Sequence, residues 1–126
     1  MPDQHMKILT VDDFSTMRRI IRNILRQIGY SNIAEAENGG AALNTLQTQD
    51  IDFVISDWNM PGMSGLELLQ AIRADATLHE LPVLLLTAEA DQGTVVEAMR
   101  LGVNGYIFKP FTPRTLEENL DAIFTR

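Results

Sequence analysis

The stretches ILTVDD (residues 8–13) and FVISD (residues 53–57) decide the fold, because each is an apolar run that ends in aspartate. Such a continuous apolar run is typical of a parallel-sheet strand that helices cover on both faces. Two later runs follow the same rule, since VLLLT (residues 83–87) ends in threonine and YIFK (residues 106–109) ends in lysine. In an open parallel sheet the carboxyl ends of the strands converge on one crevice, where ligands bind. The pattern therefore predicts that carboxylates, a hydroxyl and an ammonium group meet at one edge of a sheet.

Helical patterns alternate with these strands along the chain. The first predicted helix has Ser15 as its N-cap and stops at Gly29. Its apolar stripe recurs at helical spacing and consists of Met17, Ile20, Ile21, Ile24, Leu25 and Ile28. The other expected elements are a strand at 33–36, a helix at 41–47, a helix through Leu66, Leu69 and Ile72, a helix at 94–101 that Gly102 ends, and a helix that Thr112 caps and that buries Leu116, Leu120 and Ile123. This alternation predicts an α/β fold, a doubly wound five-stranded parallel sheet flanked by five helices, and leaves the strand order open.

The composition excludes several classes of protein. The chain has 126 residues, which fits a single domain, and no cysteine, which excludes disulfides and thiolate metal sites. Its formal net charge of −7 argues against direct binding to nucleic acid, since a basic face usually neutralises the phosphates. No apolar run approaches the roughly 18 residues that cross a bilayer, so we expect no membrane span and a cytoplasmic location. The two histidines, His5 and His79, are expected at the surface.

The side chains at the predicted strand ends suit phosphoryl chemistry. Three carboxylates, Asp12, Asp13 and Asp57, repel one another unless a cation binds or some stay protonated. Oxygen ligands suit Mg²⁺ better than zinc, which usually recruits histidine or cysteine. An aspartate also accepts a phosphoryl group as a nucleophile, and Lys109 and Thr87 would then neutralise and hydrogen-bond that group. Each residue alone is more often a turn former, a strand residue or a loop charge. Their joint placement at one sheet edge favours a site.

Four motifs carry a resemblance to a known family. VDD (residues 11–13), DWNMP (57–61), TAE (87–89) and GYIFKPF (105–111) resemble those of the receiver domain of two-component response regulators. DFSTMRR (residues 13–19) brings the chain nearest to the single-domain chemotaxis regulators of that family, and the resemblance spans residues 7–124. It implies a flavodoxin-like sheet in strand order 2-1-3-4-5. It also implies a polar N-terminal tail at 1–6 and a receiver domain at 7–126.

The resemblance assigns a role to each residue of the predicted site. Asp57 would accept a phosphoryl group from a histidine kinase, and Thr87 and Lys109 would contact that group. Asp12, Asp13 and Asp57 would hold Mg²⁺ together with the main-chain carbonyl of Asn59. Asn59 and Glu89 would tune hydrolysis of the acyl phosphate. The Lys109-Pro110 peptide bond is expected to be cis.

The family's switch implies a function by binding. Thr87 and Tyr106 would move together on phosphorylation and remodel the face made by the fourth helix, fifth strand and fifth helix. A simpler reading of Tyr106 is a half-buried aromatic residue of the strand. The expected partners are a chemotaxis-type histidine kinase, a flagellar motor switch protein or other chemotaxis component, and a phosphatase. The protein would be a monomer and a phosphoacceptor switch, not an enzyme.

The predicted output face departs from the family's pattern and leaves alternatives open. It reads DQG at residues 91–93 and EEN at 117–119, where the better-known chemotaxis regulators tend to carry lysines. Fewer lysines would attract an acidic partner peptide less strongly. A phosphate sink, a non-flagellar pathway and a receiver excised from a longer regulator therefore stay open. A small aspartate-nucleophile phosphatase of the haloacid dehalogenase type is a further alternative, although that class normally has Asp-x-Asp at the first strand, where this chain has Asp12-Asp13.

Overall fold

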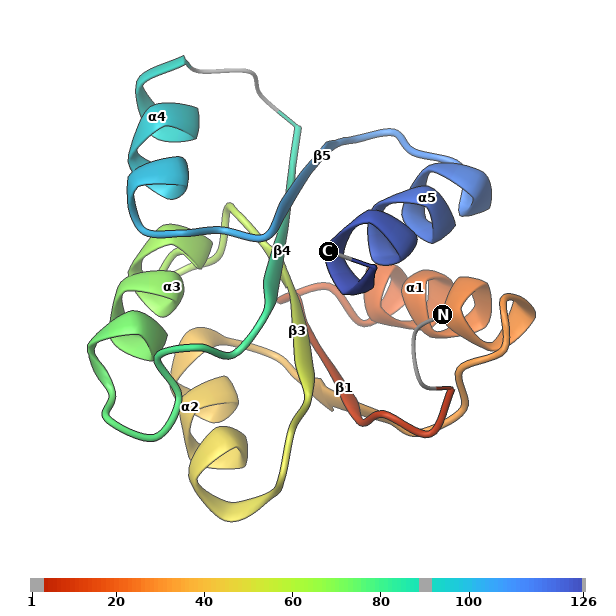
Figure 1. Ribbon diagram of the computed structural model, residues 1–126, viewed down its shortest axis with the longest axis horizontal. Coiled ribbons are helices and arrows are strands. Elements are labelled where there is room, and N and C mark those ends of the chain that lie inside the picture. The colour runs from red at the N-terminus through yellow and green to blue at the C-terminus, as the bar shows by residue number, and fades with distance from the viewer. Residues whose placement is uncertain (1–3, 89–91, 126) are drawn as a thin grey trace.

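In the computed structural model, which describes residues 4–88 and 92–125, strands and helices alternate along the chain (Figure 1). Their bounds are β1 (Ile8–Val11), α1 (Ser15–Gln27), β2 (Ile33–Ala36), α2 (Gly39–Thr48), β3 (Phe53–Asp57), α3 (Gly65–Ala74), β4 (Val83–Thr87), α4 (Gln92–Arg100), β5 (Gly105–Phe108) and α5 (Pro113–Phe124). The strands form one sheet in the order β2-β1-β3-β4-β5, and every pairing is parallel. The predicted fold class and strand order are confirmed.

Helices cover both faces of the sheet. Helices α1 and α5 lie on one face, and α2, α3 and α4 lie on the other (Figure 1). Strand β3 serves both layers, because Phe53 and Ile55 pack with α1 and α5 while Val54 packs with the other three helices. All five residues of β3 and all five of β4 are buried, as the continuous apolar runs predict. Met6, just before β1, is also buried in the layer of α1 and α5.

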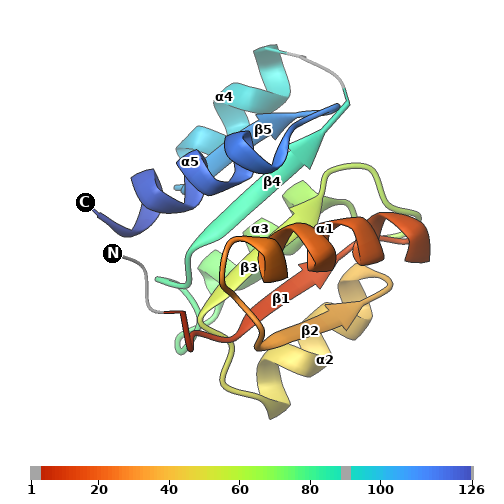
Figure 2. The ribbon, with the colours of Figure 1, turned by 90° about the vertical axis from the view of Figure 1, so that its right-hand side faces the viewer.

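The strand register brings the predicted site residues to one edge. Val11 pairs with Ser56, Asp57 with Leu86, and Thr87 with Phe108, so the carboxyl ends of four strands lie level. Figure 2 shows the strands running in the same direction across the sheet. The chain reverses its strand order between β1 and β3, where open parallel sheets form their ligand crevice. Asp12 and Asp57 lie at this switch point.

The start of α1 differs from the prediction. Phe14, not Ser15, is the N-cap, and no side-chain cap bond is present at this end within the described chain. Ser15 is already the first helical residue, one position too late for its hydroxyl to serve as a cap. The N–H of Phe14 donates a hydrogen bond to Oδ1 of Asp12, at 3.0 Å. The loop before the helix therefore depends on Asp12.

The predicted apolar stripe of α1 is correct for the core and wrong at one position. Ile21, Ile24 and Leu25 are buried, whereas Ile20 is 43% exposed because it lies on the outer face of the helix. The last residue of α1 is Gln27, and the predicted stop residue Gly29 lies two positions later with a φ of +110°, which favours glycine.

The other helix ends follow capping chemistry. Asn38 caps α2, so this helix begins at Gly39, two residues before the prediction. Helix α4 also begins two residues early, at Gln92. Thr112 caps α5 as expected, and Leu116, Leu120 and Ile123 are buried beneath it. None of the described helices has the length and hydropathy needed to cross a membrane.

Candidate functional site

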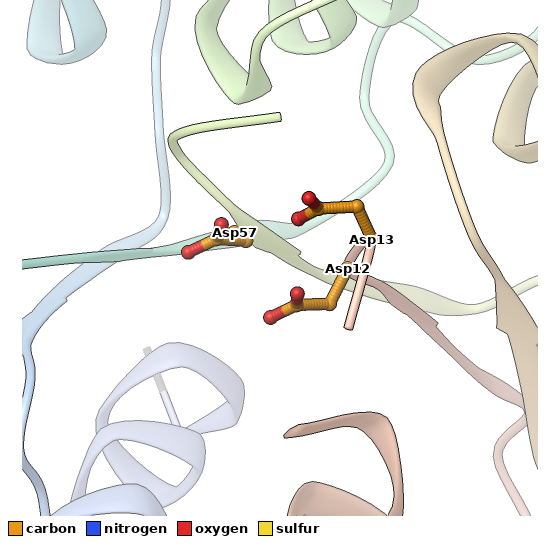
Figure 3. Close-up of side chains that lie close together, drawn as sticks. All are labelled: Asp12, Asp13 and Asp57. Atoms are coloured by element: carbon orange, nitrogen blue, oxygen red, sulfur yellow. The ribbon is translucent and has the colours of Figure 1, made fainter. Parts of the chain in front are cut away.

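Three aspartates meet at the carboxyl edge of the sheet. Asp57 is the last residue of β3, and Asp12 and Asp13 directly follow β1. Asp12 is 1% exposed and Asp57 is 6% exposed. One carboxylate oxygen from each of the three lies within 4.8 Å of the other two. Figure 3 shows Asp12, Asp13 and Asp57 at the ends of the two neighbouring strands. The structure thus brings together the carboxylates that the sequence pattern predicts at this edge.

Two oxygens of this acid cluster accept no hydrogen bond from the described residues. Oδ2 of Asp12 and Oδ1 of Asp13 are buried and have no hydrogen bond to any described residue. Burial raises the pKa of the Asp12 carboxyl above its usual range, and the negative charges of Asp57 and Asp13 raise it further, against the lowering effect of the Phe14 N–H and the Lys109 ammonium. Buried carboxylate oxygens that accept no hydrogen bond, at this spacing, fit a hard divalent cation that keeps several of its own waters, such as Mg²⁺.

Lys109 supplies the positive charge of the site. Its Nζ lies 2.5 Å from Oδ1 of Asp57 and 3.9 Å from Oδ2 of Asp12. Its main-chain N–H donates to the carbonyl of Thr87 at 2.7 Å, which ties the residue after β5 to the end of β4. The Lys109-Pro110 bond is cis, as expected. The ammonium group therefore lies directly against the carboxylate predicted to accept the phosphoryl group.

Thr87 and Tyr106 lie on the strands beside the acid cluster. Thr87 is 2% exposed at the end of β4. The ring of Tyr106 packs edge-on against Trp58 and Phe108, with centroid distances of 5.8 and 5.3 Å. Its hydroxyl is buried and has no hydrogen-bond partner in the part of the chain that the structure describes. The simpler reading of Tyr106, a half-buried strand aromatic, describes its position here.

The remaining predicted residues are less constrained by the structure. Asn59 lies two residues after Asp57, in the loop before α3, and is exposed. Glu89 lies outside the described residues. His5 and His79 are exposed, in agreement with their surface reading.

Two residues that contact the site were not predicted from the sequence. Arg18, in the first turn of α1, donates from Nη1 to the main-chain carbonyl of Asp12 at 2.6 Å. Gly65, at the start of α3, lies so close to β3 that a Cβ there would overlap the carbonyl oxygen of Asp57. No pattern in the sequence indicated the contact of Arg18 or that of Gly65.

Helix α3 has a detectable start signal that explains how Gly65 is held. Ser64 accepts from the N–H of Glu67, and the Glu67 side chain accepts from the N–H of Ser64. This capping box appears in the sequence as Ser-x-x-Glu before an apolar run. The N–H of Gly65 also donates to the carbonyl of Trp58 at 2.8 Å. The turn after Asp57 is therefore closed by backbone contacts.

The geometry supports attack by a carboxylate on a phosphoryl group. Asp57 provides a buried carboxylate, and Lys109 provides an ammonium that would neutralise charge on the transferred group. Asp12 and Asp13 provide oxygens for a cation beside it. Histidine and cysteine ligands for a transition metal are absent from this group of described residues.

Comparisons with known proteins show the family of the chain. The family model of the response regulator receiver domain matches residues 8–121. The chain is 58% identical over 124 residues to chemotaxis protein CheY-3 of Vibrio cholerae, covering 98% of this chain and 95% of the relative. It is 56% identical over 121 residues to chemotaxis protein CheY of Pseudomonas aeruginosa, covering 96% of this chain and 98% of the relative.

Solved structures show the same fold. Chemotaxis protein CheY4 of Vibrio cholerae, crystallised at low pH, superposes with a TM-score of 0.88 at 34% identity, covering 95% of this chain and 99% of that one. A putative response regulator from Chloroflexus aurantiacus superposes with a TM-score of 0.88 at 31% identity, covering 97% of this chain and 99% of that one. Both similarities span nearly the whole chain.

Proposed function

The chain belongs to the response regulator receiver domain family, and we propose that it is a phosphoacceptor switch of the chemotaxis type. A histidine kinase would donate a phosphoryl group to Asp57. The observation that carries the proposal is the buried Asp57 carboxylate, with Nζ of Lys109 at 2.5 Å and two further carboxylates within 4.8 Å. Similarity to chemotaxis proteins of two organisms supports the pathway.

In the proposed reaction, an Asp57 carboxylate oxygen attacks the phosphorus of a phosphohistidine. The P–O bond forms as the P–N bond breaks, and the imidazole leaves with the electron pair. Lys109 forms an ion pair with Asp57 in this structure and would instead pair with the phosphoryl oxygens after the transfer. The hydroxyl of Thr87, which is buried, would donate a hydrogen bond to one of these oxygens. Asp12, Asp13, Asp57 and the main-chain carbonyl of Asn59 would hold Mg²⁺, which neutralises phosphoryl charge when bound. Asn59 and Glu89 would set the rate at which water hydrolyses the acyl phosphate.

The output of the switch would pass through Tyr106. Its hydroxyl is buried and its ring lies between Trp58 and Phe108, so a rotation of this ring changes the packing beside β5. Movement of Thr87 toward the phosphoryl group would favour that rotation. The elements of the proposed output face carry exposed apolar side chains. On α4, Val96 is 55% exposed and Met99 is 68% exposed, and on β5 Phe108 is 47% exposed. We propose a flagellar motor switch protein or another chemotaxis component as the partner.

The protein would act as a cytoplasmic monomer that changes partners instead of turning over a substrate. Residues 7–126 would form the receiver domain, with residues 1–6 as its N-terminal tail. A chemotaxis-type histidine kinase would load Asp57, and a phosphatase would assist its release. The family's signalling role supports this reading over that of a general phosphatase.

The test exploits Trp58, the single tryptophan, which is buried beside Asp57. Addition of Mg²⁺ and then acetyl phosphate is expected to change Trp58 fluorescence in two steps, and intact-mass analysis should find one added phosphoryl group. Asp57→Asn should abolish the second step and the mass change. Asp50→Asn, an exposed carboxylate away from the acid cluster, should behave as the wild type. Absence of a phosphorylated form in the wild type would refute the proposal.

Two further measurements separate the alternatives. Sustained phosphate release from many phosphomonoesters, far beyond one equivalent of protein, would favour a phosphatase over a switch. Beryllofluoride with Mg²⁺ imitates an acyl phosphate, so a pull-down with and without it tests the output. Binding of a flagellar motor switch protein only in its presence supports the chemotaxis output, whereas phosphorylation without any change in binding would favour a phosphate sink.

A further inference from the structure

Arg18 contacts the acid cluster, and the proposed reaction gives it no role. We propose that its guanidinium is a positioning group for the metal site, which holds the main chain of Asp12 so that the carboxylates of Asp12 and Asp13 face the cation. This inference rests on the proposed function, because Mg²⁺ binding is part of that function.

The guanidinium is held from two directions. Its Nη1 donates to the main-chain carbonyl of Asp12 at 2.6 Å, and its Nε donates to Oε1 of Glu35 at 3.1 Å. The other carboxylate oxygen of Glu35 accepts from Nη1 of Arg22 at 2.6 Å. The Arg18 side chain is 16% exposed and that of Glu35 is 27% exposed. The planar fork of arginine can serve two acceptors at once, and the ammonium of lysine cannot reproduce that geometry.

Arg18 completes the anchoring of Asp12. The main-chain N–H of Asp12 donates to the carbonyl of Ala36 at 3.1 Å, and Oδ1 accepts from the N–H of Phe14 at 3.0 Å. With Arg18 on the main-chain carbonyl, three of the four polar atoms of Asp12 have hydrogen-bond partners. The fourth, Oδ2, has no hydrogen bond to any residue in the described ranges and only the distant charge of Lys109 Nζ, at 3.9 Å. The contacts thus fix the residue and leave one oxygen for a cation.

The way α1 begins makes this contact more important. Among the described residues, no side chain caps the N-terminus of α1, so the loop at residues 12–14 lacks the bond that usually sets the start of a helix. Arg18 reaches back from the first turn to the carbonyl of Asp12. Glu35 extends the contact to β2, so the loop is fixed to the sheet as well as to the helix.

A substitution of Arg18 changes both the local charge and the hydrogen bond to Asp12, and the two effects must be distinguished. Removal of Arg18 alone also removes a positive charge near the cation, and this change by itself would favour Mg²⁺ binding. Two variants keep the local charge constant. Arg18→Lys retains the cation and loses the fork. The double variant Arg18→Met/Glu35→Gln removes both members of the ion pair.

Mg²⁺ titrations of the full chain, followed by Trp58 fluorescence and by calorimetry, test the inference. Both charge-conserving variants should raise the dissociation constant for Mg²⁺ about three- to tenfold. This lies at or below the roughly 10- to 100-fold loss typical of outer partners of metal ligands, because Arg18 acts through the main chain and not on a ligand atom. A control variant, Arg26→Met, changes an exposed arginine on the same helix and should leave the constant within twofold of the wild type.

A second control separates positioning from stability. Arg73→Met removes hydrogen bonds at the opposite end of the sheet and should lower the free energy of unfolding without changing Mg²⁺ affinity. If Arg18→Lys and the double variant lower stability but bind Mg²⁺ as the wild type does, Arg18 is only structural and the inference is overturned. If the wild type itself shows no Mg²⁺ binding, the metal site of the proposed function fails, and the inference fails with it.

Discussion

The two ends of the sheet differ in how fully their charged side chains are hydrogen-bonded. At the amino end, the guanidinium of Arg73 uses all five of its N–H donors on the carbonyl oxygens of Leu101, His79, Leu81 and Gly102 and on Oδ1 of Asn104. At the carboxyl end, Asp12, Asp13 and Asp57 crowd together beside the ammonium of Lys109. Two of their buried oxygens have no hydrogen bond to any described residue.

This difference distinguishes a guanidinium whose donors all have acceptors from the carboxylates of the proposed metal site. Arg73 links the end of α4 and the loops before β4 and β5 to α3 by hydrogen bonds, and each of its guanidinium N–H groups has an acceptor. A buried polar group without a partner is costly, so native proteins rarely keep one without a function. We therefore expect the carboxyl end to be less stable without a bound cation and the hydrogen bonds of Arg73 to stabilise the amino end. The predictions that follow change one end at a time.

The largest effect is expected where backbone approaches backbone at the carboxyl end. In Gly65→Ala the new Cβ would overlap the carbonyl oxygen of Asp57 and lie 3.0 Å from Cα of Trp58. Backbone atoms cannot rotate away, so we expect a loss of about 3 kcal/mol in the free energy of unfolding. Urea denaturation measures it. Gly40→Ala, where the nearest atom would be 3.4 Å away, should be neutral or stabilising. Equal effects of the two changes would show that the contact at Gly65 yields easily.

At the amino end, Arg73→Met should cost about 2 kcal/mol, because it leaves several carbonyl oxygens without a charged donor while keeping most of the apolar stem. Chemical denaturation gives the value, and Mg²⁺ affinity should not change. The comparison variant is Arg114→Met, which removes the ion pair between Glu118 and an arginine side chain that is 87% exposed. It should lower the free energy of unfolding by less than about 0.5 kcal/mol. A loss no larger than that of Arg114→Met would show that the Arg73 hydrogen bonds contribute little net stability.

Neutralising one acid should stabilise the carboxyl end. In EDTA, Asp13→Asn should raise the free energy of unfolding by about 1 kcal/mol, because it relieves repulsion with Asp12 and Asp57. In saturating Mg²⁺ the wild type should be the more stable of the two proteins, since the bound cation stabilises it more than it stabilises the variant. Unfolding curves under the two conditions measure both effects. Asp50→Asn, at an exposed position, should change neither. A destabilised Asp13→Asn in EDTA would contradict the repulsion.

The smallest effect is a pH dependence that Asp12 contributes. Because burial raises the pKa of Asp12 in the folded chain, the folded state binds more protons than the unfolded state between the two pKa values. The contribution of this group to stability therefore falls as the pH rises through that interval. Asp12→Asn keeps the acceptor for the N–H of Phe14 and does not titrate.

In EDTA the Asp12→Asn variant should be more stable than the wild type at neutral pH. This advantage should shrink as the pH falls toward about 4, the ordinary value for aspartate. The difference between the two unfolding free energies, measured across this range, isolates the group from other titrations. A difference that stays constant with pH would contradict the raised pKa.

Much of the carboxyl end was predictable from the sequence, because the signals that place its residues lie within a few positions along the chain. Asp12, Asp57, Thr87 and Lys109 each follow an apolar run, and parallel strands align their carboxyl ends. The cap of α5 at Thr112 is likewise a local signal. Ser15 failed as a cap because a cap depends on the residue at which the backbone enters the helix, and sequence patterns place such boundaries poorly.

The sequence by itself determined the fold class, the alternation of elements and the residues at the strand ends, since apolar periodicity and strand direction follow from chain-local chemistry. Only the tertiary structure decided how those residues are held. Arg18 meets a carboxylate 17 positions away, and Arg73 meets acceptors up to 31 positions away. It also decided which oxygens stay unpaired, because a hydrogen bond depends on where two distant segments come together, and no pattern along the chain encodes that distance.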